Sequence, residues 1–296
     1  MKIKNNKALK RNLEGYLFIS PWIFGMLLFT VGPVIASFYI SFTDWNTFQS
    51  PNFVGFSNYA ELSQDPKFYQ ALKVTFTFAA FSVPLNLAGG LLAAILLNQK
   101  VRGMKVFRTI FYLPAVVSGV ATALLWRWIF NSDVGLINSV LAKIGIEGPN
   151  WLGDPSWVLP SYIIMSLWGF GNAMLIFLAA LQDLPKQLYE SADIDGASLL
   201  RKFWHITLPQ LSPIILFNLI MGIIAGLKIF TEAYIIGGAQ DAALFYMLYL
   251  WQNAFQFMQM GYASAMAWIF FVIILLITLI ILKSSPLWVY YEGKKK

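Results

Sequence analysis

Long apolar runs restrict the fold of this chain more than any other feature of its sequence. A helix needs about 20 residues to cross the hydrocarbon core of a bilayer, and six runs are long and apolar enough to do so. Backbone polar groups in hydrocarbon must find partners within the protein, and a helix provides them. We therefore expect an all-α integral membrane protein with six transmembrane helices. The predicted spans are residues 16–42, 72–98, 106–131, 157–181, 210–236 and 262–282.

Composition supports this fold class and excludes several kinds of site. Charged residues make up 12% of the 296 residues, whereas soluble domains carry about a quarter. The chain has no cysteine and one histidine, His205, which excludes disulfides, cysteine metal sites and any site that needs two histidines. We expect no metal site. The formal net charge of +7 does not indicate a nucleic-acid partner, because the basic residues flank the apolar runs.

The distribution of lysine and arginine predicts the orientation in the membrane. The positive-inside rule places the side with more of these residues in the cytoplasm. Only Lys67 and Lys143 lie clearly in the opposite loops, and three basic residues lie within spans. The other sixteen lie on one side: Lys2, Lys4, Lys7, Lys10, Arg11, Lys100, Arg102, Lys105, Arg108, Lys186, Arg201, Lys202, Lys283, Lys294, Lys295 and Lys296.

Both termini are therefore expected in the cytoplasm, as basic segments at residues 1–15 and 283–296, and an even number of spans requires the same arrangement. Residues 43–71, 132–156 and 237–261 would lie outside. The first apolar run is much longer than the about 7–15 residues of a signal-peptide core, so we expect an uncleaved span.

A polar segment separates the fourth and fifth spans. Within residues 183–209, Pro185 suits the first turn of a helix and Gly196 suits the position just after a helix end. A second helical run then leads to Pro209 at the start of span five. The residues alone leave two interpretations open, a solvated loop or a short helix that docks into a groove on another protein.

The sequence of this segment, ESADIDGAS followed by FWHITLP, resembles the EAA motif of bacterial ATP-binding-cassette (ABC) import permeases. Its IDGA core and ITLP end are most similar to the maltose-type and glycerol-phosphate-type permeases of the carbohydrate-uptake branch. Residues 53–59, 178–182 and 261–265 also resemble family segments, so the resemblance covers about residues 16–282. Ser191 stands where the family commonly has alanine, and Gly237-Gly238-Ala239 replaces its usual Gly-Gly-Pro.

The resemblance implies a type I ABC importer permease fold, in a multi-pass protein of the bacterial plasma (inner) membrane. Such a chain pairs with a second homologous permease subunit as a heterodimer and receives a sugar from an extracytoplasmic substrate-binding protein. It also binds two cytoplasmic ATPase subunits through the EAA helix. The positions that match the motif, and that we expect to couple to the ATPase, are Glu190, Ala192, Asp195, Gly196, Ala197 and Pro209.

The chain has no G-x-x-x-x-G-K-[ST] phosphate loop, so ATP and magnesium would bind on the partner ATPase subunits. We expect no cofactor on this chain and no enzymatic activity of its own. The alternative is a secondary, ion-coupled transporter of small solutes, which would place ionisable residues near the membrane midplane, where the predicted spans have none. An intramembrane enzyme is disfavoured because neither HExxH nor GxSxG occurs.

Residues near the midplane are candidates for the substrate path. At a rise of about 1.5 Å per residue, the midplane falls near residues 85, 169 and 223 of spans two, four and five. The nearest polar or aromatic side chains are Asn86, Trp168 and Asn172. Aromatic faces stack on sugars and amides bond to their hydroxyls, so Trp168 and Asn172, four residues apart, form the leading pair. Bonding between helices is an equally good account of each asparagine.

Lys228 and Glu232 share a predicted helix face farther out along span five. They would line the outer part of a cavity or form a solvated ion pair near the outer surface, and the sequence favours neither. Gly222 and Gly226 form a G-x-x-x-G pair that predicts close helix packing.

Overall fold

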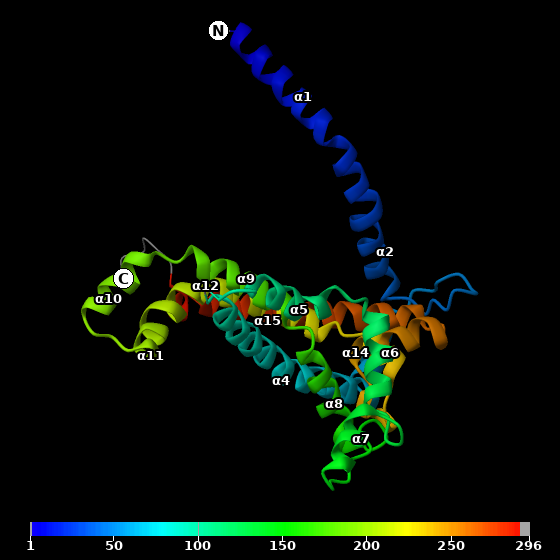
Figure 1. Cartoon of the computed structure of the whole chain (residues 1–296). Coiled ribbons are helices and arrows are strands. Elements are labelled where there is room, and N and C mark those ends of the chain that lie inside the picture. Colours follow the sequence, from blue (N-terminus) through cyan, green and yellow to red (C-terminus); the bar gives the residue numbers. More distant parts are fainter. Residues whose placement is uncertain (1, 100, 291–296) are drawn as a thin grey trace. The chain divides into compact units, whose positions relative to one another are not determined.

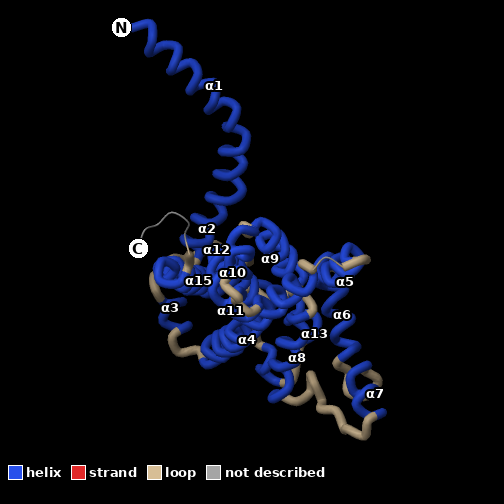
Figure 2. Tube along the Cα trace, turned by 60° about the vertical axis from the view of Figure 1, so that its left-hand side comes forward, coloured by secondary structure: helices blue, strands red, loops and turns tan. Residues whose placement is uncertain are grey.

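The computed structural model describes residues 2–99 and 101–290, with side chains from residue 12 onward. Every regular element in this range is a helix, apart from one isolated bridge between Thr43 and Phe53. Figure 2 shows the helices, in blue, with tan loops between them. The predicted all-α class is confirmed. Lys100, the basic side chains before residue 12 and those after residue 290 lie outside this range, so the structure gives no placement for that part of the predicted cytoplasmic charge.

The chain divides into two compact units, Met1–Gln64 with Leu250–Phe271, and Asp65–Tyr249 with Val272–Lys296. Unit 1 contains α1 (Lys2–Met26), the π-helical turn η1 (Leu27–Val31), α2 (Gly32–Ile40) and α3 (Ser57–Leu62). It also contains the π-helical turn η4 (Gln252–Gln256) and the first part of α15 (Met260–Trp288). Figure 1 colours these elements along the sequence.

Two motif segments that are far apart in the sequence meet within unit 1. The amide of Asn58, which is buried, donates to the carbonyl oxygens of Ser41 and Thr43 at 2.8 and 2.9 Å and so closes the end of α2. The N–H of Gly261 donates to the carbonyl of Trp45 at 3.1 Å. A β-carbon at position 261 would lie 1.9 Å from the Thr43 carbonyl oxygen, so only glycine fits this backbone contact.

Unit 2 is built around α4 (Pro66–Leu97), which packs against α8, α9 and α12. Asp65 and Asp154 cap α4 and α8 by accepting backbone N–H bonds from Lys67 and Ser156, both at 2.9 Å. The remaining elements of unit 2 are α5 (Met104–Val116), α6 (Gly119–Ile129), α7 (Leu136–Lys143), α8 (Pro155–Leu167), α9 (Gly171–Asp183), α10 (Lys186–Ile194), α11 (Leu199–Lys202), η2 (Phe203–Thr207), α12 (Leu208–Leu227), α13 (Thr231–Ile236) and η3 (Gln240–Ala243). Helix α14 (Tyr246–Trp251) begins in unit 2 and ends in unit 1, and α15 begins in unit 1 and ends in unit 2.

Four described helical segments, some made of several consecutive elements, are long and apolar enough to cross a membrane: Asn12–Ile40, Pro66–Leu97, Leu199–Ile236 and Met260–Trp288. Two bent pairs raise the count to six if each is one span. The pair Met104–Val116 and Gly119–Ile129 bends by 95°, and the pair Pro155–Leu167 and Gly171–Asp183 bends by 41°.

The predicted third span, 106–131, is therefore not one straight helix. Val117 and Ser118 adopt extended backbone conformations between α5 and α6. Ser118 then caps α6 by accepting the Ala121 N–H at 3.3 Å. The predicted fifth span, 210–236, is likewise interrupted between Leu227 and Thr231, where α12 ends and α13 begins.

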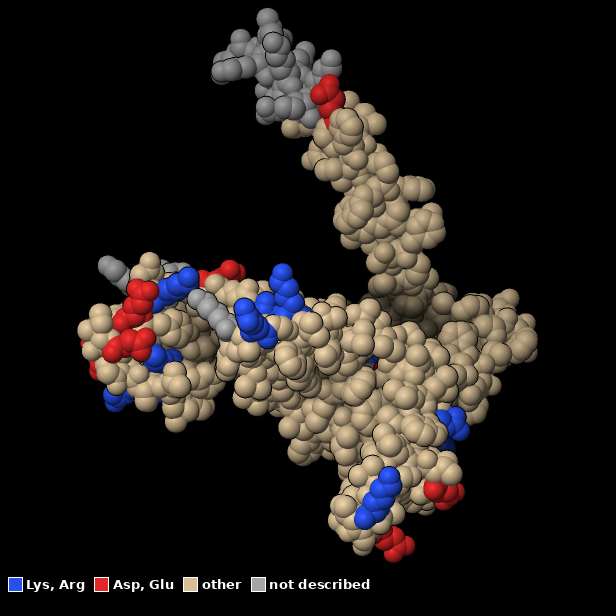
Figure 3. Space-filling model, viewed as in Figure 1, with Lys and Arg blue, Asp and Glu red and all other residues tan. Residues whose placement is uncertain are grey.

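Most charged side chains of unit 2 that Figure 3 shows lie toward two ends, one around α10 and α11 and the other around α7, with a largely uncharged surface between them. An uncharged belt between charged ends is the distribution that a bilayer requires.

Candidate functional site

A cavity of about 780 Å³ lies within unit 2. Its wall includes residues at all three helix interruptions, among them Val117 between α5 and α6, Gly169 between α8 and α9, and Ile229 between α12 and α13. Non-helical backbone at membrane depth is tolerated where it lines a cavity, because water or a ligand can then bond to the freed polar groups. All five residues proposed from the sequence for the substrate path line this cavity: Asn86, Trp168, Asn172, Lys228 and Glu232.

Trp168 lies at the end of α8, with 44% of its side chain exposed. Its indole meets that of Trp126 edge to face, with ring centroids 5.9 Å apart and planes at 82°. Trp126 is buried in the hydrophobic core beside Phe130, and its Nε1 has no hydrogen-bond partner among the described residues. A core residue therefore supports one part of the Trp168 ring, while another part remains available at the cavity wall.

The two predicted amides differ in what they already bind. Asn172, in the first turn of α9, is exposed and makes no side-chain hydrogen bond to any described residue. Asn86, on α4, donates its amide hydrogens to the Ser82 carbonyl at 2.9 Å and to the Ser166 hydroxyl at 3.2 Å. Asn86 thus links α4 to α8, whereas the whole amide of Asn172 is available to a ligand.

The expectation that Trp168 and Asn172 share one helix face assumed an unbroken span four. The structure interrupts the helix between Leu167 and Gly171, so helical spacing does not relate the two residues. They nevertheless line the same cavity, because the interruption itself forms part of its wall.

Lys228 and Glu232 stand on either side of the interruption in span five, so they too do not share a continuous helix face. Both line the cavity, and no salt bridge joins them within the described part of the chain. Gly222 and Gly226 face α4, where added β-carbons would lie 3.0 and 3.3 Å from the methyl groups of Val83. This is the close packing that the G-x-x-x-G pair predicts.

Sequence reasoning missed several other cavity residues. Ser166, Thr122 and Thr231 line the cavity. Ser166 is as close to midplane position 169 as Asn172 is, whereas Thr122 and Thr231 lie away from the predicted midplane positions. Three phenylalanines, Phe170, Phe217 and Phe230, add aromatic surface. Depth in the membrane could have identified Phe170, which is next to midplane position 169. Thr122, Phe230 and Thr231 lie within or just after helix interruptions, which nothing in the apolar pattern reveals.

The segment between the fourth and fifth spans has the predicted helix, break and second helix. We call residues 183–209 the coupling loop. Helix α10 ends with the Asp195 N–H donating to the Ser191 carbonyl at 3.0 Å and the Ala197 N–H donating to the Ala192 carbonyl at 2.9 Å. Gly196 has φ of 70°, a conformation that side chains disfavour. Ser198 then caps α11 by accepting the Arg201 N–H at 3.3 Å.

The coupling loop exposes both acidic and apolar groups. Glu190 and Asp195 are exposed, whereas Ala192, Ala197 and Pro209 are half-buried. The apolar side chains of Ile194, Leu199 and Trp204 are 87%, 83% and 56% exposed. Exposed apolar surface flanked by charges is characteristic of a protein interface.

The described residues hold no group of three histidine, cysteine, aspartate or glutamate side chains that could bind a metal ion.

Comparisons with known proteins agree with this arrangement. Residues 86–286 match the family described as binding-protein-dependent transport system inner membrane component. The probable ABC transporter permease protein YesP of Bacillus subtilis (strain 168) is 47% identical over 300 residues, covering 99% of this chain and 97% of YesP. The arabinooligosaccharides transport system permease protein AraP of the same organism is 35% identical over 276 residues, covering 91% and 88%.

Among solved structures, the crystal structure of a bacterial alginate ABC transporter in complex with an alginate pentasaccharide-bound periplasmic protein contains a similar chain. It superposes with a TM-score of 0.83 at 27% sequence identity, covering 94% of this chain and 96% of that chain.

Proposed function

Since this chain belongs to the family of binding-protein-dependent transport system inner membrane components, we propose that it forms one half of the translocation path for a sugar or oligosaccharide. It is an ABC transporter permease subunit, a transport component and not an enzyme. The observation that carries the proposal is the cavity of about 780 Å³, whose wall presents Trp168 and the unbonded amide of Asn172.

The chemistry of this wall suits a carbohydrate. The CH faces of a sugar ring stack on an indole, and its hydroxyls bond to amides and hydroxyls. Trp168 supplies the ring, while Asn172, Thr122 and Thr231 supply polar groups. Two similar proteins, AraP and the alginate transporter, carry names that refer to carbohydrates, which supports this substrate class. We assign Asn86 to the bond between α4 and α8.

Lys228 and Glu232 offer a cation and an anion at one part of the wall. Because no salt bridge joins them in the described chain, we propose that each is available to polar groups of a passing substrate.

In the membrane, we propose six spans with both termini in the cytoplasm. The two bent pairs would each count as one span, and the charged ends of unit 2 would lie at the two surfaces. The coupling loop, residues 183–209, would then face the cytoplasm and the loops around α7 would face outward. The unequal distribution of lysine and arginine supports this direction.

Membership of this permease family also implies a set of partners. We propose a second homologous permease subunit, two ABC ATPase subunits that bind ATP and magnesium, and an extracytoplasmic substrate-binding protein. The exposed Glu190 and the apolar side chains of Ile194 and Leu199 would dock on the ATPase. The complex of the alginate transporter with its periplasmic protein supports the last partner.

Uptake by the purified complex tests this function. The chain would be reconstituted in proteoliposomes with its co-purified partners, and labelled neutral and acidic oligosaccharides would be offered alongside a dipeptide and an amino acid. We expect ATP-dependent accumulation of at least one oligosaccharide. Accumulation driven by an ion gradient without ATP, or of the peptide or amino acid alone, would contradict the proposal.

A further inference from the structure

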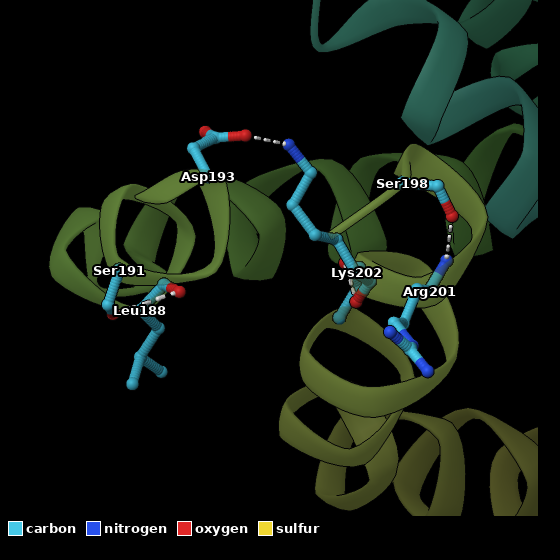
Figure 4. A network of polar contacts seen from close by, with 7 residues as sticks. Leu188, Ser191, Asp193, Ser198, Arg201 and Lys202 are labelled. Atoms are coloured by element: carbon cyan, nitrogen blue, oxygen red, sulfur yellow. Dashed lines mark hydrogen bonds and ion pairs between the residues drawn. The ribbon is translucent and has the colours of Figure 1, made fainter. Parts of the chain in front are cut away.

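Two side-chain pairs within the coupling loop join its first helix, α10, to the helix that follows and continues into α12. Tyr189 and Asp193 are four residues apart on α10 and therefore share one helix face. The Tyr189 hydroxyl lies 2.9 Å from the Thr207 hydroxyl in η2. A carboxylate oxygen of Asp193 lies 2.5 Å from the ammonium of Lys202 in α11, a contact shown in Figure 4. The face of α10 that bears Tyr189 and Asp193 is thus bonded to the following helix.

Both pairs involve groups with restricted access to water. The Lys202 side chain is only 13% exposed, whereas that of Asp193 is 62% exposed. Solvent screens a largely covered ammonium less than it screens a fully exposed one. Thr207 is buried, and its hydroxyl also lies 3.4 Å from the Lys202 carbonyl. When the Tyr189–Thr207 contact opens, the buried Thr207 hydroxyl keeps its longer contact with the Lys202 carbonyl and loses the shorter one, and this loss opposes opening.

The helix on the other side of these pairs runs directly to the cavity. Helix α11, the π-helical turn η2 and α12 follow one another without a gap from Leu199 to Leu227. The Leu208 N–H donates to the Phe203 carbonyl, which continues the helix through the π-helical turn. Asn218 and Met221, farther along this continuous helix, line the cavity. The first interruption after Leu199 comes at Lys228, which is itself a cavity residue.

We propose that the Tyr189–Thr207 and Asp193–Lys202 pairs fix α10 to the continuous helix Leu199–Leu227. When the ATPase displaces α10, this helix then moves with it and shifts the part of the cavity wall that it forms. Tyr189, Asp193, Lys202 and Thr207 are then positioning residues, distinct from the exposed groups that meet the ATPase. The turn around Gly196, whose φ of 70° marks a tight bend, also joins α10 to α11, but it fixes only the end of α10. This inference rests on the proposed function, because it needs an ATPase that moves α10.

The reactivity of a cysteine on the cavity wall can show whether the wall moves when the ATPase displaces α10. The chain has no native cysteine, so Met221→Cys gives one reactive site on this subunit. The assembled complex in proteoliposomes would be labelled with fluorescein maleimide, without nucleotide and after trapping with ATP and vanadate. The ratio of the two labelling rates is read from the gel band of this subunit. We expect a ratio clearly different from one in this parent.

Adding Tyr189→Phe or Thr207→Val should move the ratio toward one while the complex stays assembled and hydrolyses ATP. The double variant should be no worse than either single variant, because both remove the same contact. Thr278→Val is the matched control, since among the described residues the Thr278 hydroxyl bonds only to the Ile274 carbonyl of its own helix, at 2.8 Å. This control should keep the parent ratio. Parent ratios in both single variants would overturn the proposal.

Exchanging the charges of the ion pair gives a second, independent measurement if a hydroxyl variant fails to assemble. Asp193→Lys alone should move the ratio toward one, and adding Lys202→Asp should restore it. If the charge exchange does not restore the labelling ratio, the proposal is overturned. The proposal is also overturned if the Met221→Cys parent retains its ATPase but is labelled at the same rate with and without nucleotide. Purification without any ATPase would instead overturn the proposed function.

Discussion

The exposed indole of Trp168 meets the buried indole of Trp126 edge to face, with 5.9 Å between the ring centroids. Edge-to-face contact is a preferred arrangement of aromatic rings and fixes their relative orientation. Trp126 belongs to the hydrophobic core of unit 2, so the ring at the cavity wall is supported by a well-packed partner. A stacking surface that is already oriented loses little side-chain entropy when a sugar binds.

Trp168→Ala should therefore reduce oligosaccharide uptake by about tenfold, the factor that about 1.4 kcal/mol represents. Basal ATP hydrolysis by the assembled complex should persist, because Trp168 lies on the cavity wall and not in the coupling loop. Trp128→Ala is the matched control, since Trp128 is similarly exposed at 51% but does not line the cavity. Uptake and ATP hydrolysis are measured on the same proteoliposomes, and equal uptake by both variants would exclude stacking at Trp168.

The two cavity asparagines should respond differently to removal of the amide. Asn172→Ala should lower uptake by about fivefold, for the loss of one hydrogen bond to substrate, with unchanged thermal stability. Asn86→Ala should instead lower the free energy of unfolding by about 0.6 kcal/mol, because it breaks the bond between α4 and α8. Thermal melts of the detergent-solubilised complex separate the two. A stability loss in Asn172→Ala, with none in Asn86→Ala, would reverse the assignment.

Gly196→Val should impair coupling by straining the turn between α10 and α11. The left-handed conformation at φ of 70° costs a residue with a side chain about 1–2 kcal/mol. A β-carbon would meet nothing within 4 Å, so the effect is conformational and not steric. Gly196→Asn is the control, because asparagine tolerates this conformation better. We expect membrane insertion of both variants, reduced uptake in Gly196→Val and near-normal uptake in Gly196→Asn.

The proposed orientation predicts which single cysteines an impermeant thiol reagent can reach in intact cells. Cysteines at the exposed positions Ser63 and Ser132 should react, and one at the exposed position Ser198 should react only after the membrane is permeabilised. The native chain gives no background, because it has no cysteine. The reverse pattern would place the coupling loop outside and contradict the account.

The fold class could be predicted because the apolar runs and the membrane leave few alternatives. The break at Gly196 was equally predictable, since glycine after a short amphipathic helix is a local signal. The 95° bend between α5 and α6 was not, because the residues around Val117 are as apolar as those of a straight span. Ser118 could have signalled a helix start, but serine also occurs within membrane helices.

The candidate site was predicted from depth in the membrane, not from geometry. Depth identified Trp168 and Asn172 at the cavity wall, although the helix-face argument that paired them assumed an unbroken span. The different hydrogen bonding of Asn86 and Asn172 could not be predicted, because it depends on where Ser166 of α8 meets α4. The Tyr189–Thr207 contact was also missed, since it requires α10 to fold back against η2.

Affinity purification tests the central claim most directly. The tagged chain, extracted from its native membrane in a mild detergent, should carry an ABC ATPase and a second permease subunit, both identified by mass spectrometry. Glu190→Lys, which reverses an exposed charge on α10, should insert in the membrane, keep the second permease and lose most of the ATPase. Recovery of the wild-type chain without any ATPase would contradict the account.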